Sequence, residues 1–269
     1  YQTGTQRLSE PHHVVVFELA RSGRLGRLHT AYAHIAGGPT VLDVRPAPAE
    51  PEPPRELIDW DAWLGPAPWR PYNSRYIAGA WRGDADFHTG AIGEWGAHTI
   101  AQCLQAIEPP PASPVLIEPA PNTSGHGTRL QFANGVTLIL EAGSGHWHGA
   151  CGEWIEGDEG AAGAADGYSA PDVSHPGLLR ESRRLLAIYQ QRTARALDHV
   201  RNFLDCVRRR EPPVAHAGIM HRSMCLVHAA NIAVRLQRSL VWDPAAEQFR
   251  DAPEANRFLS RAARAPWLF

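Results

Sequence analysis

The sequence predicts an α+β protein in which helices cover one face of an antiparallel sheet. Apolar residues recur with helical spacing near both ends of the chain, but they alternate with period two between Pro114 and Gly167. The pair Asn134-Gly135 lies between two alternating segments and is typical of a tight hairpin turn. Consecutive strands flanked by helices favour this class over a regular alternation of strand and helix.

The chain up to residue 107 predicts two helices, one strand and a long excursion. Pro11 suits the first turn of a helix over Ser9–Gly23, and a strand follows over Arg27–Ile35. Six prolines between residues 37 and 55 predict an extended excursion rather than a domain boundary. A second helix, entered through three glycines, is expected over Thr89–Ile107.

The rest of the chain predicts a run of strands followed by helices. We expect helices over Ala194–Arg210 and His216–Gln237, and short helical turns in the tail to Phe269. The expected strands are Val115–Glu118, Thr128–Phe132, Val136–Glu141, Trp147–Ile155 and a weaker segment near Ala161.

Charge and composition exclude several classes of function. The 26 basic and 28 acidic residues give a net charge of −2, which argues against nucleic acid or anionic lipid as the main partner. Every basic residue is arginine, so mechanisms that need a lysine amine are excluded. No run approaches the roughly 18 apolar residues of a membrane span. The chain opens at Tyr1, so we expect upstream residues that could hold an export signal, while a cytoplasmic location is favoured.

Disulfides and metal binding are not expected. The four cysteines form no CxxC pair and are expected to be buried free thiols. His146 and His148 alternate on a predicted strand shortly before Cys151, and they supply at most part of a metal site. We therefore predict no metal and expect His12 and His13 to be satisfied structural or surface residues.

Glu94 and His98 form the most informative pair of chemistry-bearing residues. They stand four apart, so on the predicted helix they share a face and can touch. A carboxylate beside an imidazole fixes its tautomer and raises its basicity, as a general base requires. Glycines at positions 90, 93 and 96 suggest that a ligand or another backbone approaches closely. An ordinary Glu–His pair on the surface is the alternative.

Seven aromatic residues between Trp60 and Phe87 admit two interpretations. The rings either pin a loop to the body of the fold or form an amphipathic wall for a sugar-like ligand. The candidate substrate-binding residues are Tyr72, Tyr76, Arg82 and Trp95.

Several motifs resemble those of one oxidoreductase family. Residues 59–68 (DWDAWLGPAP) resemble a WDxWLGPAP signature, and residues 90–98 (GAIGEWGAH) are similar to GxxGDxGxH. Residues 1–11 (YQTGTQRLSEP), 21–27 (RSGRLGR), 199–208 (HVRNFLDCVR) and 242–244 (WDP) match further parts. The chain is thus similar to the C-terminal domain of the glucose–fructose oxidoreductase / inositol dehydrogenase / MocA family, in its WLGPAP-containing subgroup.

This resemblance implies a large, mostly antiparallel open sheet and an N-terminal Rossmann domain, which is absent here and binds NAD or NADP. Residues 1–10 would be the tail end of that dinucleotide-binding domain, starting in its last strand, and residues 11–269 the substrate-binding and oligomerisation domain. The lysine of the family's Glu-Lys-Pro motif belongs to the absent half. His98 stands at the position of the family's acid/base; Glu94 replaces an aspartate and Gln102 an acidic residue that often follows.

The chain itself contains no GxGxxG or GxxxxGK[ST] motif and is expected to bind neither cofactor. We expect the substrate-binding and catalytic-base domain of an NAD(P)-dependent oxidoreductase acting on a sugar, polyol or sugar derivative. The domain is expected to be inactive alone and to form homo-oligomers through its sheet. In the expected reaction His98 takes or gives the proton of the substrate hydroxyl group, and Glu94 orients the His98 ring. The alternative is a non-enzymatic carbohydrate-binding or oligomerisation module that has lost its nucleotide domain.

Overall fold

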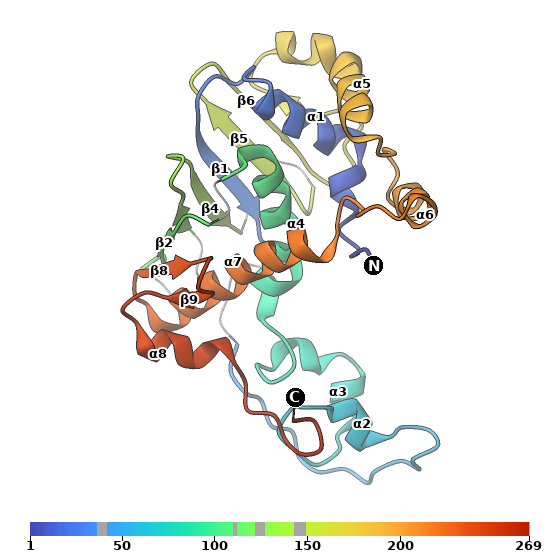
Figure 1. Cartoon of the computed structure of the whole chain (residues 1–269). Helices are drawn as coiled ribbons and strands as arrows, with labels where there is room; N and C mark the ends of the chain where they lie inside the picture. The colour runs from blue at the N-terminus through green and yellow to red at the C-terminus, as the bar shows by residue number, and fades with distance from the viewer. Residues whose placement is uncertain (37–41, 110–111, 122–126, 143–148, 269) are drawn as a thin grey trace.

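One sheet forms the framework of the protein (Figure 1). Its strands are β1 (Leu28–His34), β2 (Val115–Glu118), β3 (Thr128–Gln131), β4 (Thr137–Glu141), β5 (Glu153–Gly157), β6 (Gly160–Ala164), β7 (Asp172–Val173), β8 (Leu240–Asp243) and β9 (Gln248–Phe249). A computed structural model describes residues 1–36, 42–109, 112–121, 127–142 and 149–268, and within these the nine strands lie in the order β7-β6-β5-β1-β4-β3-β2-β8-β9. β1 and β4 are parallel, and the other neighbouring pairs are antiparallel.

Three long helices, α1 (Pro11–Arg21), α4 (Gly90–Ile107) and α7 (Ala217–Leu236), cover one face of this sheet. α1 contacts β6, α4 contacts β1 and β5, and α7 contacts β2 and β3 (Figure 1). The described part of the chain contains no helix long and apolar enough to cross a bilayer. The remaining helices are α2 (Trp60–Leu64), α3 (Ser74–Ile77), α5 (Ser182–Thr193), α6 (His199–Arg209), α8 (Pro253–Asn256) and the 3-10 helices η1 (Gln6–Ser9), η2 (Ala80–Gly83), η3 (Pro176–Glu181) and η4 (Arg257–Leu259).

Burial alternates along the central strands, as the period-two pattern predicts. On the helix side, Ala31, Leu138 and Ile155 are fully buried. Their neighbours Tyr32 and Ile139 point to the other face and are only partly buried. The predicted fold class is therefore confirmed: a mostly antiparallel open sheet has one face against helices.

Gly96 lies where α4 packs against β1 and α7. A Cβ atom built on Gly96 would lie 3.4 Å from side-chain atoms of Ile35 and Val227, which is an ordinary van der Waals contact. The close approach predicted from the glycines of α4 is thus not required at Gly96, where alanine would fit.

Several elements differ from the sequence prediction. The helix expected from Ala194 begins at His199, because Ala194 has a left-handed φ of 53° and ends α5, which the sequence pattern did not reveal. Asp198 then caps α6 by accepting from the backbone N–H of Arg201 at 2.6 Å. The strand expected over Trp147–Ile155 begins only at Glu153, since Cys151 has a φ of 52°; residues 147 and 148 lie outside the described residues. β7, β8 and β9 were not anticipated, and residues 1–10 form η1 and no strand.

Residues 42–88 form an arm that lies away from the sheet (Figure 1). Trp60, Leu64 and Tyr76 form a separate small core, in which the rings of Trp60 and Trp63 stack at 4.8 Å. The C-terminal tail is bound to the arm, because Arg264 donates to Asp61 at 2.7 Å. The aromatic block therefore holds the arm together rather than pinning it to the sheet.

Candidate active site

Arg7 connects His98 of α4 to Asp166, which lies just beyond β6. The Nε and Nη2 atoms of Arg7 donate to the two carboxylate oxygens of Asp166 at 2.8 and 2.6 Å. Nη1 of the same guanidinium lies 3.4 Å from Nδ1 of His98. A bidentate arginine–carboxylate pair fixes the plane of the guanidinium, so Nη1 is held beside the imidazole.

This neighbourhood keeps His98 neutral. Burial lowers the pKa of the imidazole, the Arg7 cation lowers it further, and the Asp166 carboxylate opposes both effects. Arginine only donates hydrogen bonds, so Nδ1 of His98 accepts and the neutral ring carries its hydrogen on Nε2. The contact with Arg7 therefore selects one tautomer of His98.

A pocket lies beside His98. Its walls are formed by residues 1–5, by Ala97 and His98 of α4, and by the first turns of α7. The side chains of Met220 and Met224 give it an apolar side, and Thr5 donates to the Met220 sulfur at 3.4 Å. An apolar wall with a few fixed polar groups is the usual composition of a small-molecule site.

The predicted contact between Glu94 and His98 is not made. The Glu94 carboxylate lies 3.5 Å from Nε of Arg82 and 3.9 Å from Nε2 of His88, and its side chain is 47% exposed. The i, i+4 spacing does place both residues on one side of α4. However, Arg82 in η2 attracts the Glu94 carboxylate, whereas Arg7 occupies Nδ1 of His98.

The other predicted site residues are not among those that line the pocket beside His98. Tyr76 is buried in the arm, where its hydroxyl donates to the Arg45 carbonyl and accepts from Ala47 and Arg70. Tyr72 packs edge-on against Trp60 in the same arm. Arg82 lies over the ring of Trp81, and Trp95 packs against the main core.

Sequence reasoning missed a buried polar cluster behind this site. Nδ1 of His13 lies 2.8 Å from the carboxylate of Glu153, and both side chains are fully buried. Burial raises the pKa of Glu153 and lowers that of His13 to about 4. Gln102 donates to the Cys151 carbonyl at 3.2 Å. The signal for Glu153 was available: it has the same parity as Ile155 in the alternating pattern and therefore points inward.

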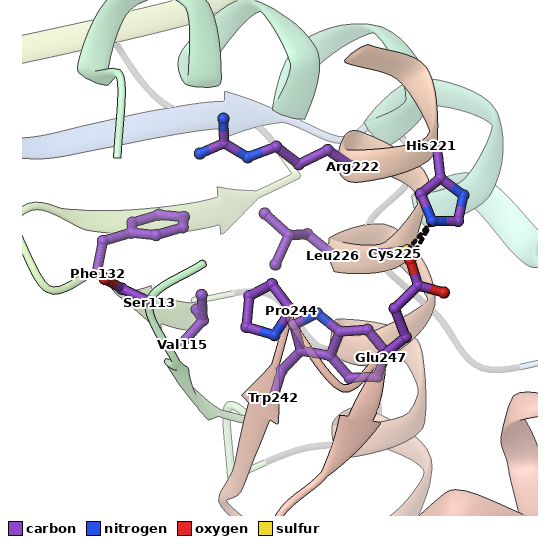
Figure 2. A pocket seen from close by; sticks show the side chains of 10 residues that line it. All are labelled: Ser113, Val115, Phe132, His221, Arg222, Cys225, Leu226, Trp242, Pro244 and Glu247. Carbon is purple, nitrogen blue, oxygen red and sulfur yellow. Dashed lines mark hydrogen bonds and ion pairs between the residues drawn. The ribbon is translucent and has the colours of Figure 1, made fainter. Parts of the chain in front are cut away.

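A second pocket lies between α7 and the paired strands β2 and β8 (Figure 2). Its apolar lining includes Phe132, Leu226 and Trp242. At its rim Nε2 of His221 lies 2.5 Å from a Glu247 oxygen and 3.6 Å from the sulfur of Cys225.

Cysteine burial is only partly as predicted. All four thiols are free, and three are buried, but Cys225 is half-buried. The possible metal ligands His146 and His148 lie outside the described residues.

An open, mostly antiparallel sheet with helices on one face, and a half-buried histidine beside a pocket, define an α+β domain with a candidate small-molecule site. Residues 45–269 match the C-terminal alpha/beta domain of the GFO_IDH_MocA oxidoreductase family. The chain therefore belongs to the glucose–fructose oxidoreductase / inositol dehydrogenase / MocA family, as its motifs predict.

Solved structures share this fold. The WlbA dehydrogenase from Bordetella pertussis, solved with NADH and UDP-GlcNAcA, matches with a TM-score of 0.50 and 15% identity over 87% of this chain and 62% of that one. The aldose-aldose oxidoreductase from Caulobacter crescentus has a TM-score of 0.49 and 13% identity over 88% of this chain and 62% of its own. This chain thus spans less than two thirds of the length of these structures. The comparison with curated proteins gives no match.

Proposed function

We propose that this chain is the substrate-binding and catalytic-base domain of an NAD(P)-dependent oxidoreductase that acts on a sugar, polyol or sugar derivative. The observation that carries the proposal is the half-buried His98, held by Arg7 beside a pocket, in a chain of this family. Residues 11–269 form the substrate domain, and residues 1–10 are the end of a dinucleotide-binding domain.

The described residues do not fit a dinucleotide. In these parts of the chain no strand leads through a glycine-rich turn into a helix, the unit that holds a pyrophosphate. We therefore assign the nicotinamide, and with it the hydride transfer, to a separate part of a longer protein. This chain supplies substrate contacts and proton chemistry.

His98 is the residue that meets the reacting oxygen. With Nδ1 occupied by Arg7, the neutral ring offers an N–H at Nε2, which binds a carbonyl oxygen and stabilises charge developing on it. Accepting the proton of a hydroxyl group at Nε2 requires the other tautomer, in which Nδ1 carries the hydrogen and Arg7 no longer donates to it. Arg7 thus favours the tautomer of His98 that donates a hydrogen bond from Nε2 over the tautomer that accepts a proton there.

A titration followed by NADH and NADPH fluorescence tests whether the cofactor binds to a part of the protein outside this chain. This chain is compared with a longer protein that includes the residues encoded upstream of Tyr1. We expect binding by the longer protein only, and oxidation or reduction of sugars and polyols only there. Micromolar binding by this chain contradicts the domain assignment. A start codon directly before Tyr1 instead supports the non-enzymatic carbohydrate-binding or oligomerisation module.

We also propose that the sheet face opposite the described helices joins two copies of the chain. The pairing register aligns Trp154, Tyr32 and Ile139 in one row across β5, β1 and β4. All three side chains are partly exposed. A row of large, partly exposed apolar side chains favours an interface over a fully solvated surface.

A further inference from the structure

Three metal-binding donors meet where η1 passes into α1. Glu10 precedes the helix, and His12 and His13 lie in its first turn. Oε2 of Glu10 lies 3.6 Å from Nε2 of His12 and 3.8 Å from Nε2 of His13. Both Nε2 atoms are buried, and neither has a hydrogen-bond partner among the described residues. This differs from the satisfied structural histidines that the sequence predicts.

The other ring nitrogen of His13 is bound to the protein. Nδ1 of His13 lies 2.9 and 2.8 Å from the two oxygens of Glu153. A hydrogen on Nδ1, donated to Glu153, leaves the Nε2 lone pair of His13 for a metal ion. An acceptor behind the ring is the usual support of a metal-binding histidine.

The contacts with Glu10 are not hydrogen bonds. Both distances from Glu10 Oε2, 3.6 Å to Nε2 of His12 and 3.8 Å to Nε2 of His13, exceed hydrogen-bond range. The two buried Nε2 atoms therefore have no partner among the described residues. A cation among the three donors would satisfy both ring nitrogens and the carboxylate.

Donor type and spacing suit a transition-metal ion. Zinc bonds of about 2.0–2.1 Å at tetrahedral angles set neighbouring donors roughly 3.3–3.4 Å apart. The two separations from Glu10, 3.6 and 3.8 Å, are slightly longer than this spacing, and all three donor atoms lie within 4.8 Å of one another. Two imidazoles and one carboxylate are the donor set of many zinc and non-haem iron sites that keep a position open for water. Glu10 is 35% exposed, so solvent can reach the centre of the cluster.

We propose that Glu10, His12 and His13 bind one divalent transition-metal ion of the Zn²⁺ class, with Glu153 orienting His13 from behind. The site goes beyond the proposed function, none of whose steps needs a metal.

Co²⁺ titration of this chain, followed by visible absorption, tests the site directly. One other described group, His221, Cys225 and Glu247, also brings three metal-binding donors together. The titration is therefore done in a Cys225→Ser background, which removes the thiolate of that group. We expect one equivalent of Co²⁺ with d–d absorption and no thiolate charge-transfer band, displaced by Zn²⁺. Absence of d–d absorption, or absorption seen only when Cys225 is present, overturns the proposal.

Variants locate the ion. His12→Ala and Glu10→Gln change partly exposed side chains, and circular dichroism checks that each variant is folded. Both should abolish Co²⁺ absorption, and Glu153→Gln should weaken binding about 10–100-fold, as loss of a carboxylate behind a ligand histidine does. His29→Ala, an exposed histidine on β1, serves as the control and should bind Co²⁺ normally. Unchanged binding in a folded His12→Ala variant places the ion elsewhere and overturns the assignment.

Discussion

Nη1 of Arg7 lies 3.4 Å from Nδ1 of His98, and this contact sets both the charge and the tautomer of the imidazole. The same guanidinium is held by both oxygens of Asp166, so its position is fixed. Three segments far apart in the sequence therefore define the electrostatics of one candidate catalytic group.

Arg7→Ala should raise the pKa of His98. The substitution removes a cation, frees the Asp166 carboxylate and opens the ring to water, and each change favours the imidazolium form. An NMR titration of the His98 ring in this chain measures the shift. Arg27→Ala removes an exposed arginine that directly precedes β1 and pairs with Asp158, and it should leave the titration unchanged. An unchanged His98 titration in Arg7→Ala contradicts the electrostatic role of Arg7.

In the longer protein, His98→Ala should lower kcat by about 10²–10⁴ with a much smaller effect on substrate binding. Glu94→Gln should have little effect, because that carboxylate is partly exposed and lies beside Arg82 rather than His98. Steady-state kinetics on both variants gives the comparison. Near-normal turnover of His98→Ala would show that His98 takes no part in the chemistry. A large loss of kcat in Glu94→Gln would instead support the Glu94–His98 contact that the sequence predicts.

Much of the fold could be predicted from the sequence, because local patterns determine it. Val115–Glu118 forms the expected strand, and the Asn134-Gly135 turn joins β3 and β4. The missed strands are short, since β7 and β9 contain two residues each and β8 only four, and the missed helix α5 ends at an alanine rather than a glycine. A left-handed alanine has no signature in a single sequence, since its conformation is imposed by the surrounding structure.

The candidate site was less predictable, because its contacts are long-range. His98 could be singled out from the GxxGxxGxH spacing, but Arg7 and Asp166 stand in unrelated segments and meet only in three dimensions. The i, i+4 rule indicates that Glu94 can reach His98, although it cannot show that Arg82 attracts the carboxylate more strongly. The spacing of residues in the sequence indicates which contacts are possible, but competing charges in the folded protein determine which contacts form.

Gly163→Ala should destabilise the fold more than Gly96→Ala. A Cβ on Gly163 would lie 2.4 Å from the Glu153 carbonyl and 2.5 Å from the ring of Trp154, so β5 and β6 must move apart. At Gly96 the contacts begin at 3.4 Å, and alanine gains about 1 kcal/mol of helix propensity. We expect a loss of about 1–3 kcal/mol for Gly163→Ala and a change near zero for Gly96→Ala, measured by urea unfolding. Equal losses contradict the packing described for both positions.

Ile139→Glu should prevent self-association through the sheet. Ile139 lies beside Tyr32 on the sheet face opposite the described helices and directly opposite Arg129 of β3, so a glutamate there gains a cross-strand partner within its own chain. The fold should therefore survive, while a charge in the apolar row disfavours burial against a second copy. Sedimentation velocity over a range of concentrations should show association of the unmodified chain and a monomeric variant. Ala133→Glu, on the exposed hairpin turn, is the control and should associate normally. If the unmodified chain stays monomeric at high concentration, or Ile139→Glu associates equally well, the row across β5, β1 and β4 is not an interface.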